Sequence, residues 1–120
     1  MTDRLGLRPH AVRREDREDG TIVLHSAYDL GPVDRSTGVW LDRWANATPD
    51  ALFLAERAGS GWRTLTYSEA RAQVYALAAG LLGRAIDGPI MILSGNSIDH
   101  ALLSLAAQYV GLITVPVAEQ

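Results

Sequence analysis

The order of apolar and turn-forming residues near the C-terminus constrains the fold most strongly. Residues 90–93 form an apolar run without alternation, which is typical of a strand buried on both faces of a sheet. A tight turn at 94–97 leads into a helical apolar pattern at 98–109, which ends at Gly111. Residues 112–117 form a second β-prone run. A strand, a helix and a second strand in this order predict a βαβ unit with parallel strands.

This unit also predicts an incomplete fold. A parallel sheet needs more than two strands and helices on both faces, and the chain supplies only part of that. We therefore expect an α/β fold that is the N-terminal part of a larger domain, cut within the fold. Taken alone, such a piece would be marginally stable, because its two strands would lack sheet neighbours or helix cover.

The N-terminal region has a different character. Residues 1–20 carry mixed charges without periodicity, and we predict a flexible, solvated arm there. Residues 21–25 form a short β-prone run, and Gly31-Pro32 predicts a loop after it. The expected organisation is an arm at 1–20 and the truncated domain at 21–120.

A helix is predicted from Thr37 to about Asn46. Trp40, Leu41 and Trp44 fall on one apolar face of this helix. The two tryptophans would suit the lining of a ligand pocket, but aromatic residues at helical spacing more often lie in the core. We favour the core interpretation.

Two β-prone runs at 51–56 and 62–67 are separated by a glycine-rich turn and predict a hairpin. Arg57 and Arg63 flank it as expected surface charges. A long helix follows, with Ser68 as a plausible N-cap. Its apolar stripe has the 3.6-residue spacing of one helix face and consists of Val74, Leu77, Ala78, Leu81, Leu82 and Ala85.

The turn at 94–97 is the feature of the chain that is most typical of a ligand-binding site. It follows a strand and opens a helix, where free backbone N–H groups favour an anion, and Gly95 would permit close approach. Gly95, Asn96 and Ser97 are therefore candidates for cofactor binding. The alternative, which we favour, is ordinary capping, with Asn96 or Ser97 as the cap and Asp99 in the first helical turn.

No catalytic or metal site is predicted. Asp99 and His100 are adjacent in a helix, so their side chains do not face each other. His10 and His25 have no neighbouring ligands at metal spacing. The serines of the turn lack the G-x-S-x-G frame of a nucleophile elbow.

Composition excludes several further classes. All 11 basic residues are arginine, so no lysine-dependent step can lie in this stretch, and the absence of cysteine excludes disulfides and thiolates. A net charge of −3 argues against nucleic-acid binding. No signal peptide or membrane-spanning run is visible, and we expect a cytoplasmic protein.

Several stretches together resemble the start of adenylate-forming acyl-CoA synthetases. They are WANATPD at 44–50, TLTYSEA at 64–70, the run at 92–102 and the Gly-to-Pro strand at 111–117. The segment LSGNSIDHALL at 93–103, together with the segment DGTIVLHSAYDLGP at 19–32, is most similar to feruloyl-CoA synthases. The resemblance covers about residues 20–120.

The resemblance implies an enzyme that activates a carboxylic acid with ATP, such as the hydroxycinnamate ferulate. The acyl-adenylate forms with release of pyrophosphate, and CoA then displaces AMP. Magnesium would neutralise phosphate charge, and a lysine on a small C-terminal domain would stabilise the adenylation transition state. The family's phosphate loop, nucleotide motifs and catalytic lysine lie downstream of this chain. The 120 residues alone are thus expected to be inactive scaffold that binds no cofactor and packs against the rest of its own domain.

Two alternatives stay open at this point. The chain could be a self-standing α/β module that binds a phosphate through the turn at 94–97 or serves in interaction without catalysis. Such a module would be monomeric and cooperative and would bind a nucleotide. The chain could also be an inactive remnant of a synthetase gene.

Overall fold

The computed structural model describes residues 9–117 and divides into two units, one up to Val33 and one from Asp34 onward. Residues 1–8 of the expected arm and residues 118–120 of the expected domain lie outside the described residues. Each unit is considered by itself below.

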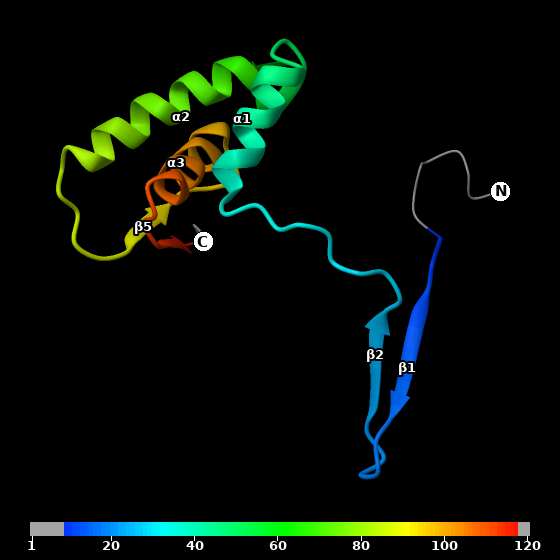
Figure 1. The fold of residues 1–120 in the computed structure, drawn as a ribbon. Coiled ribbons are helices and arrows are strands. Elements are labelled where there is room, and N and C mark those ends of the chain that lie inside the picture. Colours follow the sequence, from blue (N-terminus) through cyan, green and yellow to red (C-terminus); the bar gives the residue numbers. More distant parts are fainter. Residues whose placement is uncertain (1–8, 118–120) are drawn as a thin grey trace. The chain divides into compact units, whose positions relative to one another are not determined.

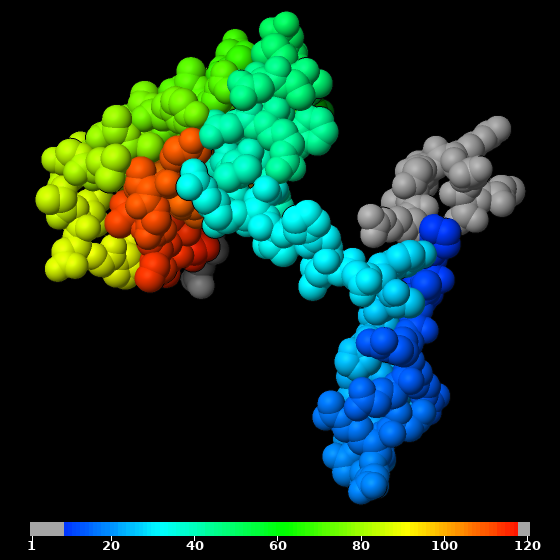
Figure 2. Space-filling model, viewed as in Figure 1, coloured from blue at the N-terminus to red at the C-terminus, as the bar shows by residue number. Residues whose placement is uncertain are grey.

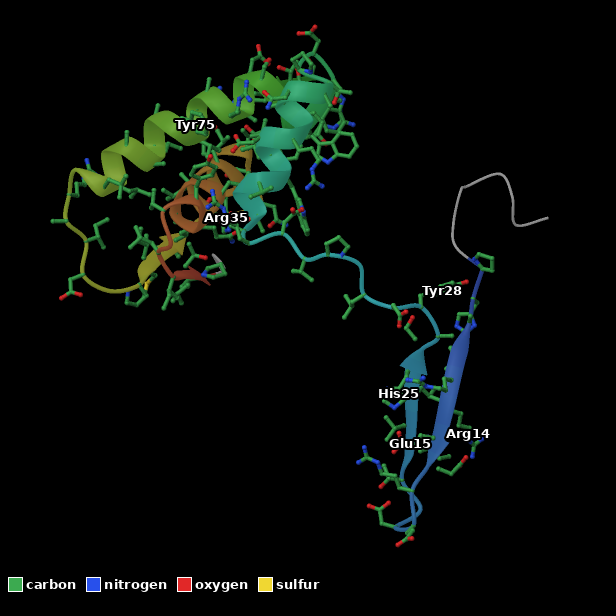
Figure 3. All side chains as sticks on the ribbon, in the orientation of Figure 1. Arg14, Glu15, His25, Tyr28, Arg35 and Tyr75 are labelled. Atoms are coloured by element: carbon green, nitrogen blue, oxygen red, sulfur yellow. The ribbon has the colours of Figure 1, made fainter. Side chains whose placement is uncertain are left out.

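The first unit is an antiparallel hairpin of β1 (Val12–Asp16) and β2 (Ile22–Ser26) (Figure 1). Gly20 has a φ of +84° in the connecting turn, a backbone conformation that favours glycine. The expectation of an arm without regular structure is therefore wrong for residues 12–16. The carboxylate of Glu15 lies 3.2 Å from Nε2 of His25 on the neighbouring strand (Figure 3). Because every residue of β1 is exposed, backbone pairing and such cross-strand contacts hold the hairpin rather than a core.

Three helices form the body of the second unit: α1 (Thr37–Ala47), α2 (Tyr67–Leu82) and α3 (Ile98–Tyr109). They pack closely against one another (Figures 1 and 2). Their buried faces supply an apolar core, because each helix carries small or branched apolar residues at a spacing of three or four. The core contains Leu41, Leu65, Ala70, Val74, Ala78, Leu81, Ile98, Leu102, Ala106 and Ala107.

The ends of α2 differ from the prediction. The N-cap is Thr66 rather than Ser68, because the Thr66 hydroxyl accepts from the Glu69 N–H while the Glu69 carboxylate accepts from the Thr66 N–H at 2.8 Å. This reciprocal capping box satisfies two free donors at once. The helix ends at Leu82, so Ala85 lies beyond it and adopts a φ of +46°. The predicted apolar stripe is thus one turn too long.

The predicted hairpin is present as β3 (Leu52–Ala58) and β4 (Gly61–Thr66). Its register shifts between Leu52 and Leu54, which is a β-bulge. The ring of Phe53 stacks on that of Tyr67 with centroids 4.6 Å apart. This contact joins the hairpin to the first turn of α2.

The βαβ unit is also confirmed. Strand β5 (Ile90–Leu93) pairs in parallel with β6 (Thr114–Val117), and α3 connects them. The expected burial of β5 on both faces is wrong: Ile92 is 4% exposed, whereas Met91 is 70% and Leu93 65% exposed. The α3 side of the pair is covered, and among the described residues of the second unit no element covers the other side.

A cluster of Asp42, Tyr75 and Tyr109 joins the three helices, and we call it the tyrosine–aspartate cluster. The Tyr75 hydroxyl donates to Oδ1 of Asp42 at 2.6 Å, and the Tyr109 hydroxyl donates to Oδ2 at 2.7 Å. Tyr75 points from α2 toward α1 (Figure 3). Hydrogen bonds to Tyr75 and Asp42, together with burial, raise the pKa of Tyr109 well above its ordinary value.

Raising the pH above about 10, the ordinary pKa of tyrosine, is expected to destabilise this unit through Tyr109. A phenol whose pKa is higher in the folded than in the unfolded chain contributes stability that is fully present below the unfolded pKa. That stability is lost as the pH rises toward the folded pKa. The measurement is the free energy of unfolding between about pH 8 and pH 12. Tyr109→Phe is the control, and an equally steep loss in that variant would contradict the assignment.

Candidate functional site

The turn at 94–97 lies at the carboxyl end of β5 and opens α3. Ser97 is the N-cap, since its Oγ accepts a hydrogen bond from the His100 N–H at 3.1 Å. Gly95 and Asn96 are exposed, and neither contributes a capping contact. Of the two caps that the sequence left open, the structure selects Ser97.

A carboxylate from the β3–β4 hairpin lies at the start of α3. Oε2 of Glu56 accepts from the Ile98 N–H at 2.6 Å, and Oε1 of Glu56 accepts from Arg63 at 3.0 Å. Arg63 also donates to Oδ1 of Asp99 at 2.8 Å. We call this group of Glu56, Arg63, Ile98 and Asp99 the hairpin–helix clamp. The negative charge that a helix N-terminus favours is thus supplied from within the chain.

The electrostatics of the clamp agree with its geometry. The hydrogen bond from Arg63, and then its Coulomb attraction, lower the pKa of the Asp99 carboxyl below its ordinary value. Hydrogen bonds to Asp99 and Glu56 raise the pKa of Arg63 in turn. Arg63 is a surface charge, as expected, with its side chain 40% exposed, and it also links two elements. Arg57 instead lies over the Trp62 ring, 4.6 Å from its centroid.

A cavity of about 270 Å³ borders the clamp. His100 is among its lining residues, and the Nδ1 atom of this histidine is buried without a hydrogen-bond partner in residues 9–117. Apart from His100, the cavity is lined by Leu54, Ala55, Glu56, Asn96, Ser97, Ile98 and Ala101. No local pattern predicts the role of Glu56, because this residue lies 42 positions before the N–H that it binds.

Replacing Glu56 with Ala is expected to lower the free energy of unfolding of the second unit by about 1–3 kcal/mol. The substitution removes the acceptor of the Ile98 N–H and leaves Arg63 with Asp99 alone. Glu56→Gln retains an acceptor oxygen without the charge and should cost less. Urea unfolding measures both variants, and equal stability of wild type and Glu56→Ala would contradict the clamp.

The tryptophans of α1 are not core residues. Trp40 is 52% exposed and Trp44 49% exposed, whereas Leu41 and Ala45 are buried. The helix turns its small residues inward, and the tryptophans lie on the edge of this face. They border a groove of about 330 Å³ whose other lining residues are Thr37, Leu41, Phe53, Tyr67 and Leu105. The predicted core role is wrong, and the pocket-lining alternative agrees with their position.

Two of the three histidines lie in different units. His25 lies in the first unit beside Glu15, and His100 lies in the second. Among the described residues, no group of three or more His, Asp or Glu side chains could hold a metal ion. Within 9–117, no helix is both long and apolar enough to cross a bilayer.

Several solved structures share the fold of these elements. A fatty acid AMP ligase from Legionella pneumophila is 20% identical over 69% of this chain, with a TM-score of 0.64. IdnL1 is 28% identical over 73% of it with a TM-score of 0.62, and CmiS6 is 28% identical over 78% with a TM-score of 0.63. The predicted α/β fold is confirmed, and it matches the N-terminal part of an adenylate-forming enzyme domain.

The family follows from the sequence itself. Residues 41–120 match the family described as AMP-binding enzyme, and the chain belongs to that family. It spans 15% of the Legionella protein, 18% of IdnL1 and 25% of CmiS6. No curated protein gives a significant match.

Proposed function

We propose that this chain is the N-terminal part of a longer, cytoplasmic enzyme that adenylates a carboxylic acid with ATP and transfers the acyl group to CoA. The family match over residues 41–120 carries this proposal. The solved structures of similar fold, one of them a fatty acyl-adenylate ligase in complex with acyl adenylate and pyrophosphate, support it.

Within this enzyme we assign the described residues a structural role. The turn at 94–97 does not fit the phosphates of ATP, because the Glu56 carboxylate already accepts from Ile98 and Asp99 adds a further negative charge. The cation beside them, Arg63, is already paired with both carboxylates. We therefore propose that ATP, magnesium and CoA bind to parts of the enzyme beyond this chain, and that the turn at 94–97 serves the start of α3, with Ser97 as its cap.

We further propose a hydroxycinnamate such as ferulate as the acid. The support is the resemblance of the segments at 19–32 and 93–103 to feruloyl-CoA synthases. The fatty acid named for the Legionella ligase is the competing substrate class.

The test is pyrophosphate release by the purified parent enzyme. Ferulate, other hydroxycinnamates and a series of fatty acids are compared with ATP and Mg²⁺ present, first without and then with CoA. We expect release with ferulate and formation of a thioester only when CoA is added. Preference for a fatty acid would overturn the substrate, and absence of release with every acid would overturn the adenylation.

The 120-residue chain serves as a control in the same assay. We expect neither pyrophosphate release nor measurable nucleotide binding by this chain alone. Nucleotide binding that is lost on replacing Ser97 with Ala would instead favour a self-standing phosphate-binding module.

A further inference from the structure

The β5–β6 pair presents an apolar face that the other described elements of the second unit leave open. Met91, Leu93 and Val115 lie on this face, because Met91 and Val115 are register partners and Leu93 is two positions after Met91. They are 70%, 65% and 41% exposed. Ile92, on the opposite face, is buried in the βαβ unit. Parallel strands of α/β proteins are normally covered on both faces, so this open face calls for a further element.

The backbone of the pair distinguishes its two edges. The Ile90 N–H donates to the Ile113 carbonyl at 2.8 Å, which fixes the phase of the parallel ladder. Since bonding directions alternate along a strand, the N–H and C=O groups of Met91 and Leu93 point away from β6. The corresponding outward groups of β6 belong to Thr114 and Pro116. Proline has no N–H, so the outer edge of β6 lacks one of the donors that another strand would need.

We infer that, in the longer enzyme, the next parallel strand pairs with β5 rather than with β6. This inference rests on the function proposed above. The helix that leads from β6 to this strand then covers Met91, Leu93 and Val115. The handedness of the crossover decides which face of the sheet this helix covers. If the next strand paired with β6, a right-handed crossover would place the helix on the same face as α3. A right-handed crossover that returns across β5 places it on the opposite face. The proline edge and the open apolar face therefore point to the same arrangement.

The occupant is a segment of the same polypeptide rather than a second copy of it. The solved chains of similar fold are several times longer than this one, which spans 15–25% of their length. A second copy that joined the β5 edge about a two-fold axis would bring in an antiparallel strand. That arrangement would pair the edge but leave the apolar face open, because no crossover helix would accompany it.

Oxidation of Met91 tests the cover on the face. Trypsin cleaves after Arg84, and residues 85–120 contain no arginine or lysine. Met91 is the only methionine among these residues, so its oxidation can be followed in one tryptic peptide. Peroxide is applied to the parent enzyme and to the 120-residue chain, and sulfoxide is followed by mass spectrometry. Because methionine oxidation follows exposure, we expect the rate at Met91 to fall by about tenfold or more in the parent enzyme. An equal rate in both proteins would overturn the proposal.

Proline substitutions test the edge. Met91→Pro and Thr114→Pro each remove an N–H that points away from the β5–β6 ladder, so both should be tolerated in the 120-residue chain. In the parent enzyme, Met91→Pro is expected to lower the urea midpoint and Thr114→Pro to leave it unchanged. Met91→Ala separates loss of the side chain from loss of the N–H. The reverse order of the two proline variants would place the next strand on β6 and overturn the proposal.

The remaining outcomes separate this inference from the proposed function. Protection of Met91 in the parent, together with the expected proline order, supports the arrangement even if no acid is adenylated, in which case only the function fails. Active enzyme with Met91 still exposed overturns the arrangement and leaves the function intact. Protection of Met91 in the 120-residue chain that rises with protein concentration would assign the face to a second copy and overturn the proposal.

Discussion

Replacing Leu102 with Ala is expected to lower the free energy of unfolding of the second unit by about 2–5 kcal/mol. Leu102 is 3% exposed in the middle of α3 and belongs to the core that α3 shares with α1 and α2. Truncation removes buried methyl groups and leaves a cavity, because helices held on several sides collapse only partly. Urea unfolding followed by circular dichroism measures the change.

Leu82→Ala is the matched control for this result. Leu82 is 66% exposed at the end of α2, so the same chemical change should cost less than about 1 kcal/mol there. If Leu102→Ala is unfolded without denaturant, a stabilising osmolyte restores a measurable transition for both variants. Equal losses at the two positions would show that the packing of α3 is not as the structure has it.

Replacing Gly38 with Ala is expected to be the other strongly destabilising change. A Cβ built on Gly38 lies 2.4 Å from Cδ2 and 2.5 Å from Cε2 of Tyr109. The Tyr109 ring cannot move away without loosening its hydrogen bond to Asp42. Alanine gains about 1 kcal/mol of helix propensity. Overpacking costs about 1–3 kcal/mol and a bond to a charged group contributes about 1.5–3 kcal/mol, so the net loss is about 1.5–5 kcal/mol.

Gly80→Ala controls for helix propensity, because a Cβ at Gly80 in α2 meets nothing within 4 Å. This variant should be as stable as the wild type or more stable by up to about 1 kcal/mol. A double-mutant cycle adds a second check: in a Tyr109→Ala background, Gly38→Ala should no longer destabilise. Persistent destabilisation in that background would refute the clash as the cause.

Local patterns in the sequence predicted the elements of the second unit. The strand, helix and strand at 90–117 and the hairpin before α2 are all present, because hydrophobic spacing and glycine turns act over a few neighbouring residues. That Thr66 rather than Ser68 caps α2 was harder to predict from the sequence. Both are good caps, and only the reciprocal bond with Glu69 decides between them.

The candidate site was only partly predictable, for a related reason. Capping of α3 by Ser97 follows from the local sequence, but the Glu56 carboxylate comes from a distant hairpin. Side chains far apart along the chain meet only after the helices and the hairpin have packed. The half-exposed Trp40 and Trp44 illustrate the same limit, since periodicity identifies an apolar face but not how much of it a neighbour covers.

The sequence by itself determined the order and type of the elements of the second unit, the absence of lysine and cysteine chemistry, and the resemblance that led to the AMP-binding enzyme family. The tertiary structure decided which carboxylate lies at the start of α3, which face of β5 is covered, and how Asp42 joins two tyrosines. Secondary structure follows from interactions between residues a few positions apart. Burial and charge pairing depend on contacts between distant segments, and these exist only in the folded chain.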